Sequence, residues 1–202
     1  MAHSPDTLPD KAGLRSLALA RRAGMDPQLR AVASEVAAGH AMDWLGDVAG
    51  EIVSVFSPIG HEIATEPLIR RLRAAGAQIA LPVVLAPGKP LIFRLWEPGV
   101  ELVATAGPGR MRIPAPPESA PAVAPDVLIV PLAGFDSRGH RLGYGAGFYD
   151  RTLALLRRAK RIEAVGYAFA VQQLPQVPAE AHDERLDAIA TDAGIIRVVA
   201  ED

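Results

Sequence analysis

Apolar and polar positions along this chain follow two periods, one typical of helices and one typical of strands. Helix-like spacing, bounded by cap residues and glycines, predicts helices over residues 9–23, 26–45, 65–76 and 147–160. Short runs rich in β-branched residues predict strands over residues 51–57, 78–84, 90–96, 126–135, 163–170 and 193–200. Strands that alternate with helices are typical of an α/β fold with an open, mostly parallel sheet flanked by helices on both faces.

The length of the chain fits a single domain. Its 202 residues suffice for one α/β domain with a substantial core and are few for two. Residues 1–8 are predicted to form a flexible tail, and residues 9–202 to form the domain. Residues 106–125 are crowded with proline, which predicts a long loop without regular structure across one face of the domain.

Composition narrows the possible chemistry. The chain has no cysteine, so disulfides, thiolate metal sites and cysteine nucleophiles are excluded. A net charge of −2 offers no broad basic surface for nucleic acid. No signal peptide is recognised, and the apolar run at 127–135 is far shorter than the roughly 20 residues that span a bilayer. We therefore expect a soluble cytoplasmic protein with no nucleic-acid or membrane partner.

Three glycines at alternate positions, Gly143, Gly145 and Gly147, follow the most hydrophobic strand and open a helix. In such sheets ligands bind at the carboxyl ends of strands, and helix N-termini bind phosphate through unpaired N–H groups. Arg138 and Arg141 add guanidinium donors suited to phosphate. The spacing is neither the dinucleotide-binding fingerprint nor a P-loop. The pattern favours an anion-binding loop, and a glycine-rich surface turn is the alternative.

Other polar residues are candidates for the same site. Asp150 follows the glycines. Beside a bound phosphate its carboxylate is a natural Mg²⁺ ligand, and the alternative is that it only places a favourable negative charge at the start of a helix. Lys11 and Arg15 lie on one helix face, where their like charges repel each other. A bound anion would relieve this repulsion; the alternative is that the face is simply solvated. Glu62 follows the first strand, a ligand position in such folds. The acidic segment 181–191 is either a source of a second metal ligand or a polar turn.

Four segments, taken in order, resemble a known enzyme family. The most specific is LAGFDSRGHRLGYGAGFYDR at 132–151, and the others are KAGLR at 11–15, FSPIGHEIATEPLI at 56–69 and VPAEAHDERLDAIAT at 177–191. This series resembles the 5-formyltetrahydrofolate cyclo-ligase family, also called 5,10-methenyltetrahydrofolate synthetases. One departure is Ala64, where many family members carry a polar or acidic residue.

The resemblance implies an ATP site. Lys11 and Arg15 would contact the phosphates of ATP. The glycine-containing loop would wrap around ATP with the following residues: Arg141, Leu142, Gly143, Tyr144, Gly145, Ala146, Gly147, Phe148 and Tyr149. Asp150 and Asp183 would ligate Mg²⁺. ATP and Mg²⁺ are therefore the expected cofactors.

The resemblance also implies a folate site. Residues expected to contact the folate are Phe56, Ser57, Glu62, Tyr144, Gly145, Ala146, Gly147 and Phe148. Glu62 would hold the pterin, and Arg141 and Tyr144 are the implied catalytic residues. The implied reaction phosphorylates the formyl oxygen of 5-formyltetrahydrofolate with MgATP, after which N10 attacks and phosphate leaves. The resemblance favours a monomeric enzyme, and the alternatives are a non-catalytic folate- or nucleotide-binding paralogue and a sugar-phosphate enzyme on a related fold.

Overall fold

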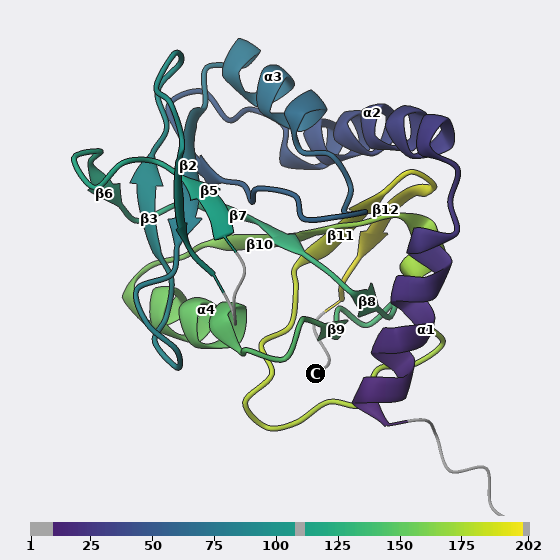
Figure 1. Cartoon of the computed structure of the whole chain (residues 1–202). Helices are drawn as coiled ribbons and strands as arrows, with labels where there is room; N and C mark the ends of the chain where they lie inside the picture. Colours follow the sequence, from purple (N-terminus) through teal and green to yellow (C-terminus); the bar gives the residue numbers. More distant parts are fainter. Residues whose placement is uncertain (1–9, 108–111, 200–202) are drawn as a thin grey trace, which may run out of the picture.

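The computed structural model describes residues 10–107 and 112–199, which form a central sheet covered by helices (Figure 1). The strands of the central sheet are β1 (Ile52–Ser54), β2 (Gln78–Val83), β3 (Ile92–Leu95), β6 (Ala122–Val123), β7 (Val127–Pro131), β10 (Glu163–Tyr167), β11 (Ala188–Thr191) and β12 (Gly194–Arg197). Their order is β12-β11-β10-β7-β1-β2-β3-β6. The five strands from β11 to β2 are parallel, and β12, β3 and β6 add antiparallel edges. The predicted α/β class with a mostly parallel sheet is confirmed.

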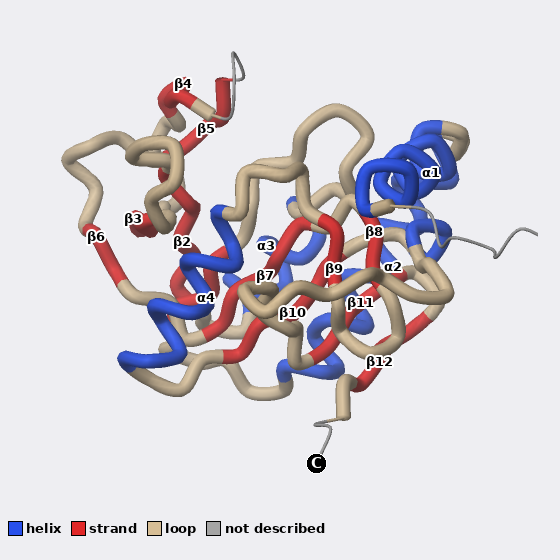
Figure 2. The backbone as a smooth tube through the Cα atoms, turned by 90° about the horizontal axis from the view of Figure 1, so that it is seen from below, coloured by secondary structure: helices blue, strands red, loops and turns tan. Residues whose placement is uncertain are grey.

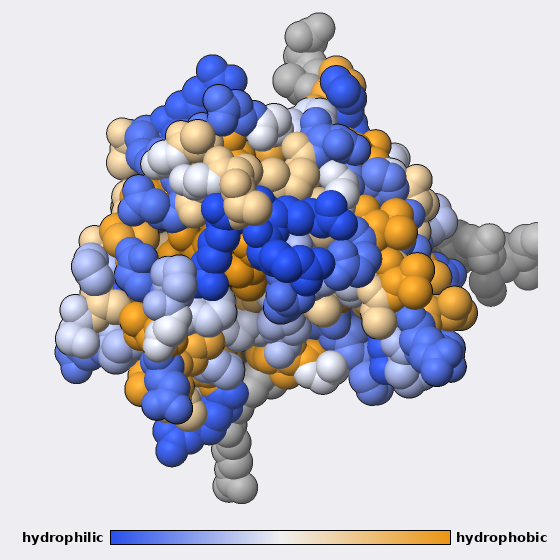
Figure 3. All heavy atoms as spheres, turned by 90° about the horizontal axis from the view of Figure 1, so that it is seen from above, coloured by the Kyte–Doolittle hydropathy of each residue, from blue (hydrophilic) through white to orange (hydrophobic). Residues whose placement is uncertain are grey.

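Helices lie on both faces of this sheet, as predicted. The helices are α1 (Lys11–Ala23), α2 (Pro27–Leu45), α3 (Glu66–Ala74) and α4 (Phe148–Ala159). In Figure 1, α2 and α3 cover one face; Figure 2, from below, shows α4 crossing the other. Ion pairs of Glu35 with Arg70 and Arg71 link α2 to α3, and Figure 3 shows hydrophilic side chains gathered at the centre of that face. No helix in these described ranges is long and apolar enough to cross a membrane.

Strand β7 forms the centre of the core. Val127 and Ile129 pack with the residues beneath α2 and α3, whereas Leu128 and Val130 pack with those beneath α4. Successive strand residues point to opposite faces, so a strand covered on both sides is apolar throughout. The continuous apolar run in the sequence therefore marks the central strand. It is shorter than the predicted 126–135, because the chain leaves the sheet after Pro131.

The proline-rich segment 106–125 contains regular structure, contrary to the prediction. Strand β4 (Val103–Ala106) pairs antiparallel with β5 (Arg112–Ala115), and β6 pairs with β3 at the edge of the main sheet. Proline lacks an N–H donor and is tolerated in edge strands. Short edge pairs therefore form here despite the proline content. The predicted tail, residues 1–8, lies outside the described residues.

Cap residues explain where two helices begin. The Asp10 carboxylate accepts the Gly13 N–H at 2.8 Å at the start of α1, and Asp26 caps α2 beside a proline at its first position. Thr65 precedes α3 but does not cap it, because its hydroxyl donates to the Phe56 carbonyl oxygen at 3.0 Å. This bond closes the loop that follows β1.

A small hairpin carries the chain from β7 to the glycine-containing loop. Its strands, β8 (Gly134–Phe135) and β9 (Arg141–Leu142), flank the fully buried Asp136. The Asp136 carboxylate accepts the backbone N–H groups of Arg138, His140 and Val177. It also accepts the Arg138 guanidinium at 3.1 Å, so Arg138 serves the hairpin in this structure.

We predict that Asp136→Asn lowers the free energy of unfolding by about 2–4 kcal/mol, because an amide nitrogen replaces one buried acceptor and the negative charge opposite Arg138 is lost. Urea unfolding should show a lower midpoint with an unchanged slope. Asp47→Asn is the matched control, since the exposed Asp47 accepts the Ala49 N–H at 3.0 Å and its change should stay within about 0.5 kcal/mol. Equal midpoints for the two variants would contradict this role of Asp136.

Candidate active site

The candidate site lies at the topological switch point of the central sheet, where successive strands extend the sheet in opposite directions. Parallel strands β1 and β7 are neighbours; from β1 the chain proceeds through α3 to β2 on one side, and from β7 through α4 to β10 on the other. Open α/β sheets bind ligands at the carboxyl ends of strands at such a switch point. Phe56 and Ser57, just after β1, and the loop 143–147 before α4 lie at this edge.

The loop 143–147, called the glycine loop below, owes its shape to two of its glycines. Gly145 and Gly147 have φ values of 90° and 63°, a region that residues with a side chain rarely adopt. A Cβ atom on Gly147 would lie 2.7 Å from Nη1 of Arg151, whose guanidinium donates to the Ala146 carbonyl. Gly147 precedes α4 without a side-chain cap, so the first N–H groups of α4 are free to meet an anion.

Two pockets adjoin the glycine loop. The first, of about 460 Å³, has mostly apolar walls that include Leu19, Phe56 and Phe148. The second, of about 500 Å³ and called the polar pocket below, is lined by glycines and alanines together with the following charged and polar side chains: Asp150, Arg151, Arg158, His182 and Glu184. Ala146, Gly147 and Asp150 line both pockets. The loop and the start of α4 therefore form a wall common to an apolar and a polar pocket.

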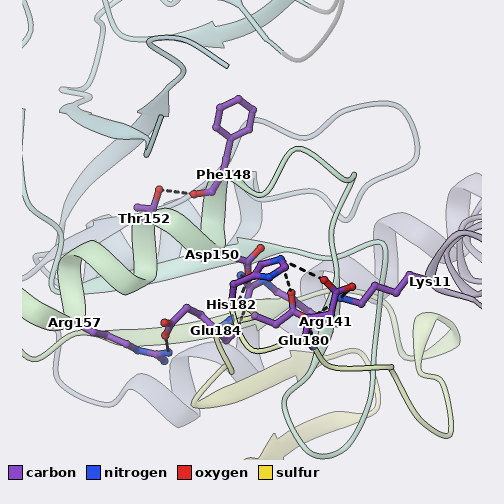
Figure 4. Close-up of polar contacts among 10 residues, drawn as sticks. Lys11, Arg141, Phe148, Asp150, Thr152, Arg157, Glu180, His182 and Glu184 are labelled. Carbon is purple, nitrogen blue, oxygen red and sulfur yellow. Dashed lines mark hydrogen bonds and ion pairs between the residues drawn. The ribbon is translucent and has the colours of Figure 1, made fainter. Parts of the chain in front are cut away.

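An ion pair between the buried Arg141 side chain and the partly exposed Asp150 holds this wall in place. The Arg141 side chain is 5% exposed, and its Nη2 atom lies 2.5 Å from Oδ1 of Asp150. Arg141 also donates to the Glu184 carbonyl, and the Glu184 N–H donates to Asp150 at 3.2 Å. Burial lowers the pKa of Arg141, while Asp150 and Asp183 oppose that shift. Figure 4 shows Arg141, Asp150 and Glu184 converging from β9, α4 and the acidic segment.

Helix α1 reaches the same region with basic side chains. Lys11 Nζ lies 2.7 Å from Asp183 and 2.9 Å from Glu180, as Figure 4 illustrates for Lys11 and Glu180. Burial disfavours the charged form of both Lys11 and Asp183, but the hydrogen bonds and opposite charges around them outweigh this effect. As a result the pKa of Lys11 is raised and the pKa of Asp183 is lowered. Arg15 donates to the Gly143 carbonyl at 2.6 Å. These contacts hold α1 against the glycine loop and the acidic segment.

Glu62 lies at the apolar pocket, on the loop after β1. Its carboxylate accepts the Tyr144 hydroxyl and, at 2.8 Å, the Ile59 N–H. Burial raises the pKa of Glu62, and these two hydrogen bonds and the charge of Arg22 work against the rise. The Ser57 hydroxyl donates to the Pro114 carbonyl at 2.8 Å and so ties this loop to β5.

The structure brings many of the sequence-predicted residues together around the two pockets, but Lys11, Arg15 and Asp183 line neither of them. Leu142 also lies outside both linings, because its buried side chain packs with Leu14 and Ala133 and leaves only its backbone for a ligand. Sequence reasoning missed Arg22 and Arg151. Arg22 lies two helical turns after Arg15, a spacing that places both on one face of α1 and that could have identified it.

Asp150 and Asp183 offer oxygen donors of the kind that Mg²⁺ prefers. In residues 10–107 and 112–199 no group of three or more histidine and acidic side chains is arranged to hold a metal ion. Mg²⁺ is usually held by one or two carboxylates together with phosphate oxygens. The two aspartates therefore fit a metal that arrives with a nucleotide.

Comparisons with known proteins agree with this architecture. The solved 5,10-methenyltetrahydrofolate synthetase of Aquifex aeolicus superimposes with a TM-score of 0.74 at 24% identity, covering 95% of this chain and 94% of that one. The synthetase of Mycoplasma pneumoniae superimposes with a TM-score of 0.72 at 21% identity, covering 91% and 99%. These likenesses establish the fold.

Sequence comparison establishes the family. The profile of the 5-formyltetrahydrofolate cyclo-ligase family matches residues 7–192. The chain is 37% identical over 177 residues to the 5-formyltetrahydrofolate cyclo-ligase of Escherichia coli (strain K12), covering 85% of this chain and 94% of that protein. It is 32% identical over 189 residues to that of Mycolicibacterium smegmatis, covering 90% and 93%. This chain therefore belongs to the 5-formyltetrahydrofolate cyclo-ligase family of enzymes.

Proposed function

We propose that this enzyme cyclises 5-formyltetrahydrofolate to 5,10-methenyltetrahydrofolate at the expense of ATP, releasing ADP and phosphate. The observation that carries the proposal is the pair of pockets, one apolar and one polar, that share the wall formed by Ala146, Gly147 and Asp150. Two substrates that exchange a phosphoryl group must meet at one point. The glycine loop and the N-terminus of α4 border both pockets, so backbone N–H groups there would lie close to a phosphoryl group that passes between the two substrates.

The folate is assigned to the apolar pocket. The planar pyrimidinone half of its reduced pterin suits walls that include Phe56 and Phe148. The ring carries adjacent N–H donors, which the Glu62 carboxylate would accept. Tyr144, hydrogen-bonded to Glu62, would hold this carboxylate in position.

ATP is assigned to the polar pocket and the adjoining end of α1. The N–H groups at the start of α4 would meet its phosphates, joined by Lys11 and Arg15. In the ligand-free structure Lys11 is paired with Asp183 and Glu180. Binding of ATP would therefore exchange carboxylate partners of Lys11 for phosphate oxygens. Asp150 and Asp183 would hold Mg²⁺, which supplies charge neutralisation to the bound phosphates.

The proposed chemistry needs positioning and charge stabilisation more than a protein nucleophile. The formyl oxygen attacks the γ-phosphorus, and ADP leaves. N10 then attacks the formyl carbon and loses its proton, and the C–O bond breaks to release phosphate. Arg141 lines the apolar pocket and contacts Asp150 on the shared wall, which supports a role in which its guanidinium would stabilise the transferred phosphoryl group. We also propose that the enzyme acts as a cytoplasmic monomer without a nucleic-acid partner.

We predict that the purified protein forms 5,10-methenyltetrahydrofolate, followed by its absorbance, only when both ATP and Mg²⁺ are present. One ATP should be consumed for each product molecule, and chelation of Mg²⁺ should stop the reaction. A folded sample that forms product equally well without ATP would refute the proposed function.

We predict that substitutions at the two ends of the site act on different substrates. Hydrogen bonds to charged groups contribute about 1.5–3 kcal/mol, so Glu62→Gln should raise the folate KM by roughly one to two orders of magnitude and leave the ATP KM nearly unchanged. Lys11→Ala should raise the ATP KM instead. Steady-state kinetics with each substrate varied in turn measures both values, and circular dichroism checks the fold. Crossed effects would mean that the two pockets are assigned in reverse.

A further inference from the structure

A buried arginine beside the folate pocket has an incomplete set of partners. Arg22, in the last turn of α1, is 7% exposed and lines the apolar pocket. Its Nη1 atom donates to the Tyr144 hydroxyl oxygen at 3.0 Å. Its Nε atom is buried and has no hydrogen-bond partner among the described residues. Burying a guanidinium without full compensation destabilises a fold, so a functional reason is expected.

The Tyr144 hydroxyl connects this charge to Glu62. It accepts from Arg22 and donates to the Glu62 carboxylate, whose other oxygen accepts the Ile59 N–H. The resulting chain, Arg22–Tyr144–Glu62, joins α1, the glycine loop and the loop after β1. A hydroxyl that accepts from a cation donates more strongly to an anion, because the bonds polarise one another.

We propose that Arg22 is a positioning residue for folate binding, which acts through the Tyr144 hydroxyl to orient the Glu62 carboxylate at the apolar pocket. The inference rests on the proposed function, in which Glu62 accepts the N–H donors of the pterin. A protonated carboxyl group would present one donor where two acceptors are needed.

The surroundings of Glu62 explain why it needs a cation. Tyr144 faces it from the glycine loop, Tyr149 interacts with it from α4, and His61 precedes it at the pocket. Burial raises the pKa of Glu62, and the Arg22 charge opposes that rise. Loss of Arg22 therefore moves the protonation of Glu62 to higher pH. Folate binding that requires the ionised carboxylate would then be lost at a higher pH than in the wild type.

The test measures the dissociation constant of 5-formyltetrahydrofolate by calorimetry, without ATP, from acid to neutral pH. Arg22→Met keeps the length of the side chain and removes its charge. We expect about tenfold weaker folate binding at neutral pH. We also expect the loss of affinity at acid pH, called the acid limb of the binding curve, to shift to higher pH. Arg21→Met is the matched control, because the exposed Arg21 on the same helix turn donates to the Gln173 carbonyl at 3.1 Å. Its binding curve should match that of the wild type.

Two further variants tie the effect to the proposed chain. Arg22→Lys should recover part of the lost affinity, and Glu62→Gln should lack the acid limb. If Arg22→Met does not unfold cooperatively, Tyr144→Phe breaks the same chain while keeping the arginine, and it should also displace the acid limb to higher pH. Wild-type affinity and pH profile in Arg22→Met, or in Tyr144→Phe in its place, would overturn the inference and leave the proposed function standing. Absence of folate binding by the wild type would overturn both.

Discussion

The ion pair between Arg141 and Asp150 is the contact on which the site depends. It joins β9 to the first turn of α4, and through the Glu184 backbone it also fixes the acidic segment. Because the Arg141 side chain is buried, removing Asp150 would leave the guanidinium charge without its carboxylate partner, which destabilises a fold. The pair therefore sets the position of the glycine loop. Because that loop is the wall shared by the two pockets, the pair also sets the separation of the pockets.

Helix α1 completes the site from the other end of the sequence. Lys11, Arg15 and Arg22 project from one face of this helix and contact Asp183, Gly143 and Tyr144 respectively. These contacts join residues more than a hundred positions apart, so the site forms only when the whole fold has formed. In the ligand-free state Lys11 is paired with carboxylates of the site, and Arg15 with a backbone carbonyl. Such pairing keeps the side chains ordered before the substrates arrive, which reduces the entropy lost on binding.

Much of the fold could be predicted from the sequence, because the relevant signals are local. The unbroken apolar run of β7 marks a strand covered on both faces, and Asp26 followed by Pro27 marks the start of α2. The pairing of β4 with β5 within and beside a proline-rich segment was not predicted, because edge pairing depends on neighbours distant in the chain. Strand β11 was also missed, because it is short and consists largely of small residues, which give a weak strand signal in the sequence.

The candidate site was predicted in outline through the family resemblance and not from residue chemistry alone. That resemblance assigned roles to Glu62, Arg141 and Asp150, which residue chemistry had already offered as candidates, and the structure places all three at one pocket. It did not name Arg22, because an arginine on a helix surface is ordinarily solvated and only the three-dimensional structure reveals its burial. The hydrogen bond of the Thr65 hydroxyl to the Phe56 carbonyl oxygen likewise depends on the fold of the loop after β1 and has no signal in the sequence.

The central claim is that the wall shared by the two pockets allows direct phosphoryl transfer from ATP to the folate. The most direct measurement uses 5-formyltetrahydrofolate whose formyl oxygen carries a heavy oxygen isotope, with the released phosphate analysed by phosphorus NMR. Direct transfer places the heavy oxygen in the phosphate, because the formyl oxygen leaves the folate bonded to phosphorus. Unlabelled phosphate, with the heavy oxygen recovered in water, would mean that ATP is hydrolysed separately and would contradict the account.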